Sequence, residues 1–258
     1  METVTSPDGA TIAYWRSGSG PPLVLVHGSV SDRTVWALVQ PALEQRFTVY
    51  AMNRRGREGS SPPQPHTMAN EFEDVAAVAD AVEEPVHLIA HSFGAVCSLG
   101  ATLLTPNVRS LVLYEPPLLG TARRRMTGDV RELVRAGRAD EALAMFLADA
   151  VRLSTDEIAR MRQSAIWPQI LAHVPNLVEE LGASEGYRLD ASRFGGLEIP
   201  VLLLVGAESP PRARELIDAL ASVLPHAQVR ELAGERHLAQ LSSPDLFTSE
   251  VLRFLDAV

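Results

Sequence analysis

Residues 86–95 read VHLIAHSFGA: an apolar run typical of a buried strand ends at Ser92, and a helical pattern follows. A serine at so tight a strand-to-helix turn takes a sparsely allowed backbone conformation, which requires small residues on both sides. Ala90 and Gly94 meet that requirement. Such a turn lifts the Ser92 hydroxyl clear of the sheet and leaves the N–H of Phe93 free at the helix start. The same pattern also fits a serine that simply caps a helix, so both interpretations stay open.

The composition is typical of a globular chain with room for one α/β domain and an insertion. Of 258 residues, 46% are hydrophobic, all 23 basic residues are arginine, and the formal net charge is −9. An acidic surface disfavours nucleic acid and anionic membranes as partners. Cys97 is the single cysteine, the residues from Met1 to Val4 carry no targeting pattern, and no run of about 18 apolar residues occurs. We therefore expect a cytoplasmic protein without a transmembrane helix.

Strand-like and helical segments alternate along most of the chain. Apolar or β-forming runs predict strands over 4–5, 11–15, 23–26, 47–51, 86–90, 110–114, 200–205 and 228–232. Helical spacing predicts helices over 34–43, 68–82, 93–104, 211–223 and 244–254. Because all-apolar runs are typical of strands buried on both faces, we predict an α/β fold with a mostly parallel eight-stranded sheet and helices on both faces.

From residue 118 to residue 198 the alternation gives way to helical patterns alone. Amphipathic spacing predicts helices over 129–136, 139–153, 155–164 and 168–181. We expect these helices to form an all-α cap, inserted into an α/β core made of residues 1–117 and 199–258. Ligands of such sheets bind at the carboxyl ends of the strands, so residues that directly follow a strand are the first candidates for a site.

Two motifs that follow other strands complete a candidate site with Ser92. The sequence His27-Gly28-Ser29 follows the strand at 23–26, and its glycine lets the backbone turn so that the N–H of Ser29 faces the same point as that of Phe93. Together these two amides would form an oxyanion hole. His27 itself fits a structural role in the loop better than a catalytic one. His237 follows the last strand and is the histidine best placed to act as a base.

Together these features resemble the α/β-hydrolase fold. The resemblance covers the whole chain, with H-G after the third strand, A-x-S-x-G after the fifth, a helical insertion after the sixth and a histidine after the eighth. The loop at 53–60, NRRGREGS, also resembles the family's loop after the fourth strand, although that loop usually opens with Asp. Ala90 and Ala95 stand where glycine is common, and both are small enough for the turn. The resemblance implies Ser92 as nucleophile and His237 as base.

The acid that would support His237 is left open by the sequence. In most of the family it follows the seventh strand, about 28 residues before the histidine. That count reaches Ser209, and its neighbour Glu208 is the nearest acid. Glu115, at the end of the sixth strand, instead resembles the placement in the haloalkane-dehalogenase-like branch. Because a carboxylate between a buried strand end and two prolines needs a partner, we favour Glu115 and keep Glu208 as the alternative.

The resemblance implies a carboxylic ester hydrolase that cleaves a small or medium, largely apolar ester, thioester or lactone through an acyl-enzyme on Ser92. Two alternatives stay open. One is a lyase or cyclase that acts on a natural-product intermediate of bacterial secondary metabolism, and the other is a catalytically silent ligand-binding protein. No metal-ligand spacing and no G-x-G-x-x-G motif occur, so we expect no metal and no cofactor. We expect a small-molecule substrate and a monomer or homodimer.

Five residues are candidates for substrate binding. Met145 and Trp167 are cap residues that could face an apolar pocket, although packing of the cap on the core explains most such side chains. Trp36 lies near the oxyanion loop in the sequence and fits either a pocket wall or the core. His27 and Gly28 belong to that loop itself.

Overall fold

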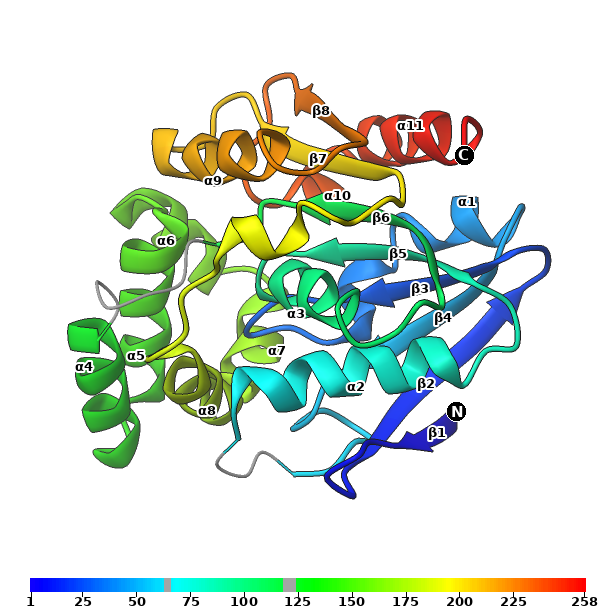
Figure 1. Ribbon diagram of the computed structural model, residues 1–258. Coiled ribbons are helices and arrows are strands. Elements are labelled where there is room, and N and C mark those ends of the chain that lie inside the picture. Colours follow the sequence, from blue (N-terminus) through cyan, green and yellow to red (C-terminus); the bar gives the residue numbers. More distant parts are fainter. Residues whose placement is uncertain (63–65, 118–123) are drawn as a thin grey trace.

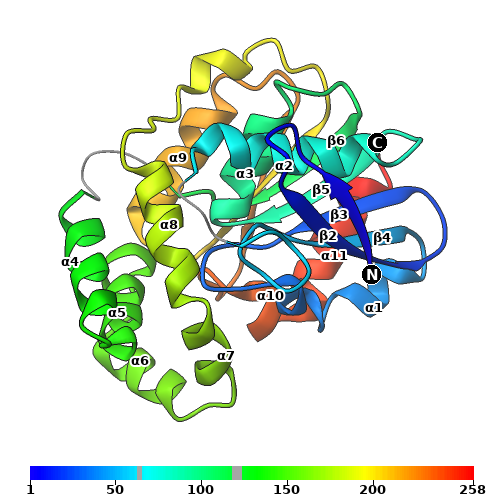
Figure 2. The same ribbon diagram turned by 90° about the horizontal axis from the view of Figure 1, so that it is seen from below.

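An eight-stranded sheet between two layers of helices forms the centre of the computed structural model, which describes residues 1–62, 66–117 and 124–258 (Figure 1, Figure 2). The strand order is β1-β2-β4-β3-β5-β6-β7-β8. Strand β2 pairs antiparallel with β1 and β4, and the other five neighbouring pairs are parallel. The predicted mostly parallel sheet is therefore confirmed.

All eight strands lie where the sequence predicts them, with ends that differ by a few residues. They are β1 (Glu2–Thr5), β2 (Thr11–Gly18), β3 (Pro22–Val26), β4 (Thr48–Asn53), β5 (Val86–His91), β6 (Val108–Tyr114), β7 (Val201–Gly206) and β8 (Ala227–Leu232). Every residue of β3, β4, β5 and β7 is buried. The all-apolar runs therefore mark the centre of the sheet, as expected for strands that are covered on both faces.

The two faces of the sheet have separate hydrophobic cores because successive side chains of a strand point to opposite faces. In β3, Leu23 and Leu25 belong to one core, whereas Val24 and Val26 belong to the other. Helices on the Val24 side are α2 (Met68–Asp80), α3 (Phe93–Ala101) and α9 (Pro211–Ala221). Those on the Leu23 side are η1 (Arg33–Trp36), α1 (Gln40–Glu44), α10 (Ala239–Ser242) and α11 (Pro244–Leu255).

The helices that follow β6 and precede β7 along the chain form a group beside the carboxyl ends of β5 and β6 (Figure 1). It comprises α4 (Arg124–Arg135), α5 (Ala139–Phe146), η3 (Leu147–Val151), α6 (Thr155–Arg162), α7 (Ile166–Ala172) and α8 (Val174–Ser184). Their apolar side chains form a third cluster, which also includes Val30 from the loop after β3. We call this group the cap. Residues 118–123, with which the predicted insertion begins, lie outside the described residues.

The chain returns to the core before the predicted insertion ends. Phe194 of η4 (Ala191–Phe194) is buried in the core cluster on the Val24 side, and Tyr187 packs against the same cluster. The cap's helices therefore end at Ser184, while the boundary at residue 198 stays a prediction. Among the described residues, no helix is both long enough and apolar enough to cross a bilayer.

Proline divides two of the predicted helices. The segment 34–43 forms parts of η1 and α1, and the segment 168–181 forms parts of α7 and α8. Pro41 and Pro175 stand in the first turns of α1 and α8. A proline offers no N–H to the carbonyl four residues earlier and its ring clashes with that carbonyl, so a helix starts at such a residue more easily than it continues through it.

Candidate active site

The turn at Ser92 has the strained conformation that the sequence predicts. Ser92 lies between β5 and α3 with φ 53° and ψ −123°, values that are costly for any residue with a Cβ. Its side chain makes no capping hydrogen bond to α3, so the interpretation as an ordinary helix cap is wrong. At Gly94 an added Cβ would lie 2.3 Å from the carbonyl oxygen of His27. The turn therefore brings α3 against the loop after β3.

Gly94→Ala is expected to lower the free energy of unfolding by about 1–3 kcal/mol, because the new methyl group must displace the backbone at His27. Urea unfolding followed by circular dichroism measures this loss. Gly128→Ala is a matched control, since Gly128 lies in α4 and an added Cβ there meets nothing within 4 Å. Alanine should stabilise that helix by about 0.5–1 kcal/mol. Equal stability of Gly94→Ala and the wild type would contradict the close approach.

Three side chains from three separate loops form one hydrogen-bonded chain. His237 lies between β8 and α10, Glu115 directly follows β6, and Ser92 follows β5. The distance from Ser92 Oγ to His237 Nε2 is 3.1 Å, and that from His237 Nδ1 to Glu115 Oε2 is 2.7 Å. An ionised carboxylate only accepts hydrogen bonds, so Nδ1 carries the imidazole proton and Nε2 accepts from the Ser92 hydroxyl. This arrangement can activate a hydroxyl as a nucleophile.

Glu115 is held in place by the strand next to its own. It has φ 45°, and its side chain is only 4% exposed. Its second carboxylate oxygen, Oε1, accepts the N–H of Gly206 at 2.8 Å and the hydroxyl of Ser209. Burial alone would raise the pKa of Glu115, but the hydrogen bond and charge of His237, with the bonds from Ser209 and Gly206, hold that pKa below its ordinary value. Glu115 is therefore ionised at neutral pH.

Glu208, the alternative acid, lies elsewhere. Its side chain is exposed, and its backbone N–H donates to the carbonyl of Glu235 at 2.9 Å. Between the two candidates, the structure brings Glu115 to His237. Counting the family spacing of about 28 residues back from His237 reaches Ser209, which carries a hydroxyl where most of the family has the acid. This hydroxyl donates a hydrogen bond to Glu115.

Two residues that the sequence did not single out hold the His237 loop. The Nε2–H of His91 donates to the carbonyl oxygen of His237 at 2.8 Å. The hydroxyl of Tyr114 donates to the carbonyl of Arg236 and accepts the N–H of Ala239 at 3.1 Å. Burial, followed by the charge of His237, lowers the pKa of His91 far enough to keep this ring neutral. In the sequence, the one feature that could have indicated a role for His91 and Tyr114 is their position as the last residues of β5 and β6.

The two predicted oxyanion donors lie next to Ser92. Phe93 is the first residue of α3, where a backbone N–H has no acceptor within the helix. Gly28 lies against the turn, since a Cβ added there would be 3.0 Å from Ser92 Cβ. Ser29 follows it and borders the same cavity as Ser92. Any larger residue at position 28 would therefore push the loop away from the serine.

A cavity of about 390 Å³ extends from Ser92 and His237 toward the cap. Most of its wall is apolar and is formed by Val30, Val35, Leu38, Phe146, Leu147, Val151, Leu153, Met161, Ile166, Ile170, Leu238 and Leu241. A polar pair also lies in this wall, Asp32 and His173, with 3.3 Å between Oδ2 and Nε2. The cavity suits a largely apolar group of moderate size.

None of the five residues predicted for substrate binding lines this cavity: its wall lacks His27, Gly28, Trp36, Met145 and Trp167. Trp36 is fully buried in the core and packs against Phe247, with ring centroids 6.2 Å apart. Trp167 is buried in the cap, where its Nε1–H donates to Asp140 at 2.9 Å, and Met145 packs against the same cap cluster. Helical spacing shows which residues share a face but does not show whether that face meets the cavity or a core.

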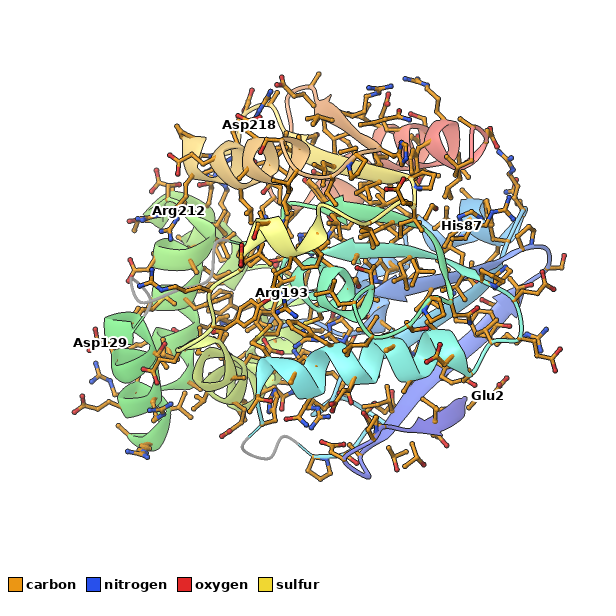
Figure 3. All side chains as sticks on the ribbon, viewed as in Figure 1. Glu2, His87, Asp129, Arg193, Arg212 and Asp218 are labelled. Atoms are coloured by element: carbon orange, nitrogen blue, oxygen red, sulfur yellow. The ribbon has the colours of Figure 1, made fainter. Side chains whose placement is uncertain are left out.

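His87 has a structural role within the sheet and lies away from the candidate site. It lies in β5 at the end remote from the cap (Figure 3), and its Nδ1 is 2.7 Å from the hydroxyl of Ser110. Burial, followed by the charge of Arg109, lowers the pKa of His87 to about 4. Within residues 1–62, 66–117 and 124–258, no group of three or more His, Cys, Asp or Glu side chains is placed to hold a metal ion.

Comparison with known proteins gives one family. The sequence model described as the alpha/beta hydrolase family matches residues 23–250. The chain is 31% identical to an alpha/beta hydrolase from Sphaerobacter thermophilus, whose crystal structure is similar with a TM-score of 0.88 over 98% of this chain and 100% of that one. Esterase RhEst1 from Rhodococcus sp. ECU1013 is 26% identical, with a TM-score of 0.79 over 99% and 98% of the two chains.

Among curated proteins, the chain is 26% identical to the probable oxidoreductase EphD of Mycobacterium tuberculosis, over 98% of this chain and 49% of that protein. The chain thus spans about half the length of the first curated relatives it matches.

Proposed function

Because this chain belongs to the alpha/beta hydrolase family, we propose that it is a serine hydrolase that cleaves a small or medium, largely apolar ester, thioester or lactone. The observation that carries the proposal is the continuous hydrogen-bonded chain from Ser92 through His237 to Glu115. A hydroxyl that faces an accepting imidazole, itself oriented by a carboxylate, is the arrangement that activates serine for acyl transfer. Similarity to an esterase over nearly the whole chain supports the same reaction class.

In the first half of the proposed reaction, Ser92 Oγ forms a bond to the substrate's carbonyl carbon while its proton passes to His237 Nε2. The carboxylate of Glu115 stabilises the resulting imidazolium. The N–H groups of Ser29 and Phe93 bind the negative oxygen of the tetrahedral intermediate. When the bond to the alkoxide or thiolate breaks, that leaving group takes the proton from His237, and the acyl group remains on Ser92.

Water completes the second half. A water molecule gives its proton to His237 Nε2 and forms a bond to the acyl carbon. The bond between that carbon and Ser92 Oγ then breaks, Ser92 recovers the proton from His237, and a carboxylic acid leaves. These steps require only the three side chains and two backbone amides described above.

The cavity supports the substrate class. A volume of about 390 Å³ lies in the range typical of small-molecule sites. Because its wall is mainly apolar, each methylene group of an acyl chain that enters it should gain about 0.8 kcal/mol, or roughly fourfold in kcat/KM. We therefore expect p-nitrophenyl butyrate to be a better substrate than p-nitrophenyl acetate.

A test of this cavity is Ile170→Phe, which adds bulk to a wall residue of α7. We expect kcat/KM for p-nitrophenyl butyrate to fall by about tenfold or more, with a much smaller change for the acetate ester, because a narrowed pocket excludes the longer chain. Leu171→Phe is the control, since Leu171 packs against the cap cluster and is not a lining residue. Equal losses with both esters, or none with either, would contradict the assigned acyl pocket.

A further inference from the structure

A buried cluster of four charged side chains lies beside the loop that carries Ser29. Arg54 and Arg57 belong to the loop after β4, Glu71 to α2 and Glu180 to cap helix α8. The side chains of Arg54 and Glu71 are fully buried, and those of Arg57 and Glu180 are at most 2% exposed. Two cations face two carboxylates, so the charges balance. Buried ions are costly even when paired, and the reaction proposed above uses none of them.

The guanidinium of Arg54 is fixed in one orientation. Its Nε and Nη2 donate to the carboxylate of Glu71 at 2.9 and 2.8 Å, and Nη2 also donates to Glu180 at 3.0 Å. The remaining arm, Nη1, donates to the backbone carbonyl oxygen of Gly28 at 3.2 Å. The guanidinium carbon Cζ lies over the ring of Phe93, 4.6 Å from its centroid. Arg54 therefore contacts Gly28, which directly precedes Ser29, and Phe93, whose own N–H is the second proposed oxyanion donor.

The carbonyl of Gly28 and the N–H of Ser29 belong to the same peptide unit. That peptide bond is trans, so the two groups point in opposite directions from a rigid plane. A donor that holds the carbonyl therefore sets the direction of the N–H. Hydrogen bonding at the carbonyl oxygen also polarises the amide, which strengthens the N–H as a donor.

His27, in its neutral form, also donates a hydrogen bond to the Gly28 carbonyl. Its Nε2 accepts the backbone N–H of Arg54 at 3.1 Å, so its proton is on Nδ1, which donates to the Gly28 carbonyl at 2.8 Å. Burial, followed by the charges of Arg57 and Arg54, holds the pKa of His27 well below its ordinary value. Of the two donors to this carbonyl, only Arg54 brings a charge.

The charge on Arg54 is stabilised from the cap. Burial alone would lower the pKa of Arg54, but the carboxylates of Glu180 and Glu71 raise it well above its ordinary value. Burial likewise would raise the pKa of Glu180, while Arg54, Arg57 and a hydrogen bond from the Ser29 side chain lower it. Glu180 thus links α8 to Arg54 and to Ser29 itself.

We propose that Arg54 is a positioning residue for the oxyanion hole: it orients and polarises the Gly28–Ser29 peptide so that the Ser29 N–H binds the negative oxygen of the transition state. Glu71 and Glu180 hold Arg54 in that position. The inference rests on the proposed serine hydrolase reaction and adds a link between the cap and the oxyanion hole.

The test compares an ester with its thionoester, in which sulfur replaces the carbonyl oxygen. Sulfur is a weak hydrogen-bond acceptor, so the ratio of kcat/KM between p-nitrophenyl butyrate and its thionoester measures the contribution of the oxyanion donors. Loss of a whole donor lowers kcat by about 10²–10³. Arg54→Met leaves the donor present but less well placed, so we expect kcat on the ester to fall by about 10- to 100-fold. KM should change little, and the ester-to-thionoester ratio should fall severalfold.

Arg55→Met is the matched control. The Arg55 guanidinium makes a similar buried pair, donating to Asp74 at 2.6 and 2.7 Å and to Asp8 at 3.0 Å, but it does not hold the Gly28 carbonyl. Its loss should lower stability and leave the ester-to-thionoester ratio unchanged. If Arg54→Met does not fold, Arg54→Lys and Glu180→Gln provide the same comparison, because lysine keeps the charge without the planar fork and glutamine removes the cap's carboxylate.

An unchanged ratio in every folded variant of Arg54 and Glu180 overturns the inference and leaves the serine hydrolase proposal standing. An equal fall in Arg55→Met also overturns it, because the effect would then reflect general loosening. A wild-type protein that hydrolyses neither probe overturns both proposals.

Discussion

Ser92→Ala is expected to lower kcat for p-nitrophenyl butyrate by at least about 10⁴-fold. We expect no other single substitution to cause a larger loss. Alanine removes the only atom that forms the bond to the acyl carbon in the proposed reaction. The backbone strain at φ 53° would remain, since alanine tolerates this conformation no better than serine does. We therefore expect the variant to fold with nearly unchanged thermal stability.

The control for this substitution lies on the helix that follows Ser92. Ser98 of α3 is buried, and its hydroxyl has no hydrogen-bond partner among the described residues. Ser98→Ala should keep wild-type activity within about twofold, as expected for a residue outside the hydrogen-bonded chain of Ser92, His237 and Glu115. Activity of Ser92→Ala close to that of the wild type would rule out an acyl-enzyme on Ser92.

Glu115→Gln is expected to lower kcat by about 10⁴-fold. The glutamine amide can present its NH₂ group to His237 Nδ1, and the imidazole then carries its proton on Nε2. In that tautomer Nε2 no longer accepts the proton of Ser92. The amide also lacks the negative charge that stabilises the imidazolium, although it nearly matches the carboxylate in size.

Glu208→Gln is the paired measurement, because Glu208 was the other acid compatible with the sequence. Its side chain is exposed, so we expect kcat and stability close to the wild type. The two variants are compared in the same assay, with thermal unfolding as the check on folding. A large loss in Glu208→Gln together with an active Glu115→Gln would reverse the assignment of the acid.

The fold follows from the sequence largely because buried strands carry a strong local signal. The runs at 23–26, 86–90 and 200–205 have no polar interruption apart from His87, and a strand covered on both faces requires such a pattern. The divided helices were less visible, since apolar spacing continues across Pro41 and Pro175 even though the backbone hydrogen bonds do not. The spacing of apolar residues indicates which side chains are buried, but it does not show where a proline ends one helix and begins the next.

The site was predicted in part, for a physical reason. Ser92 and His237 follow strands directly, so their position at the sheet edge follows from topology. The partner of His237 depends on distances across the sheet: β6 and β7 are neighbours, and the backbone at Glu115 turns with φ 45° toward Gly206. Side-chain direction in the cap was not predictable either, as Trp167 and Met145 illustrate.

The most direct measurement is the covalent labelling of the folded wild-type protein with a fluorophosphonate probe, followed by intact mass and peptide mapping. We expect one adduct per chain, located on Ser92, absent from Ser92→Ala and formed much more slowly in Glu115→Gln. No adduct on the folded wild type, or an adduct on another serine, would contradict the claim that Ser92 is an activated nucleophile.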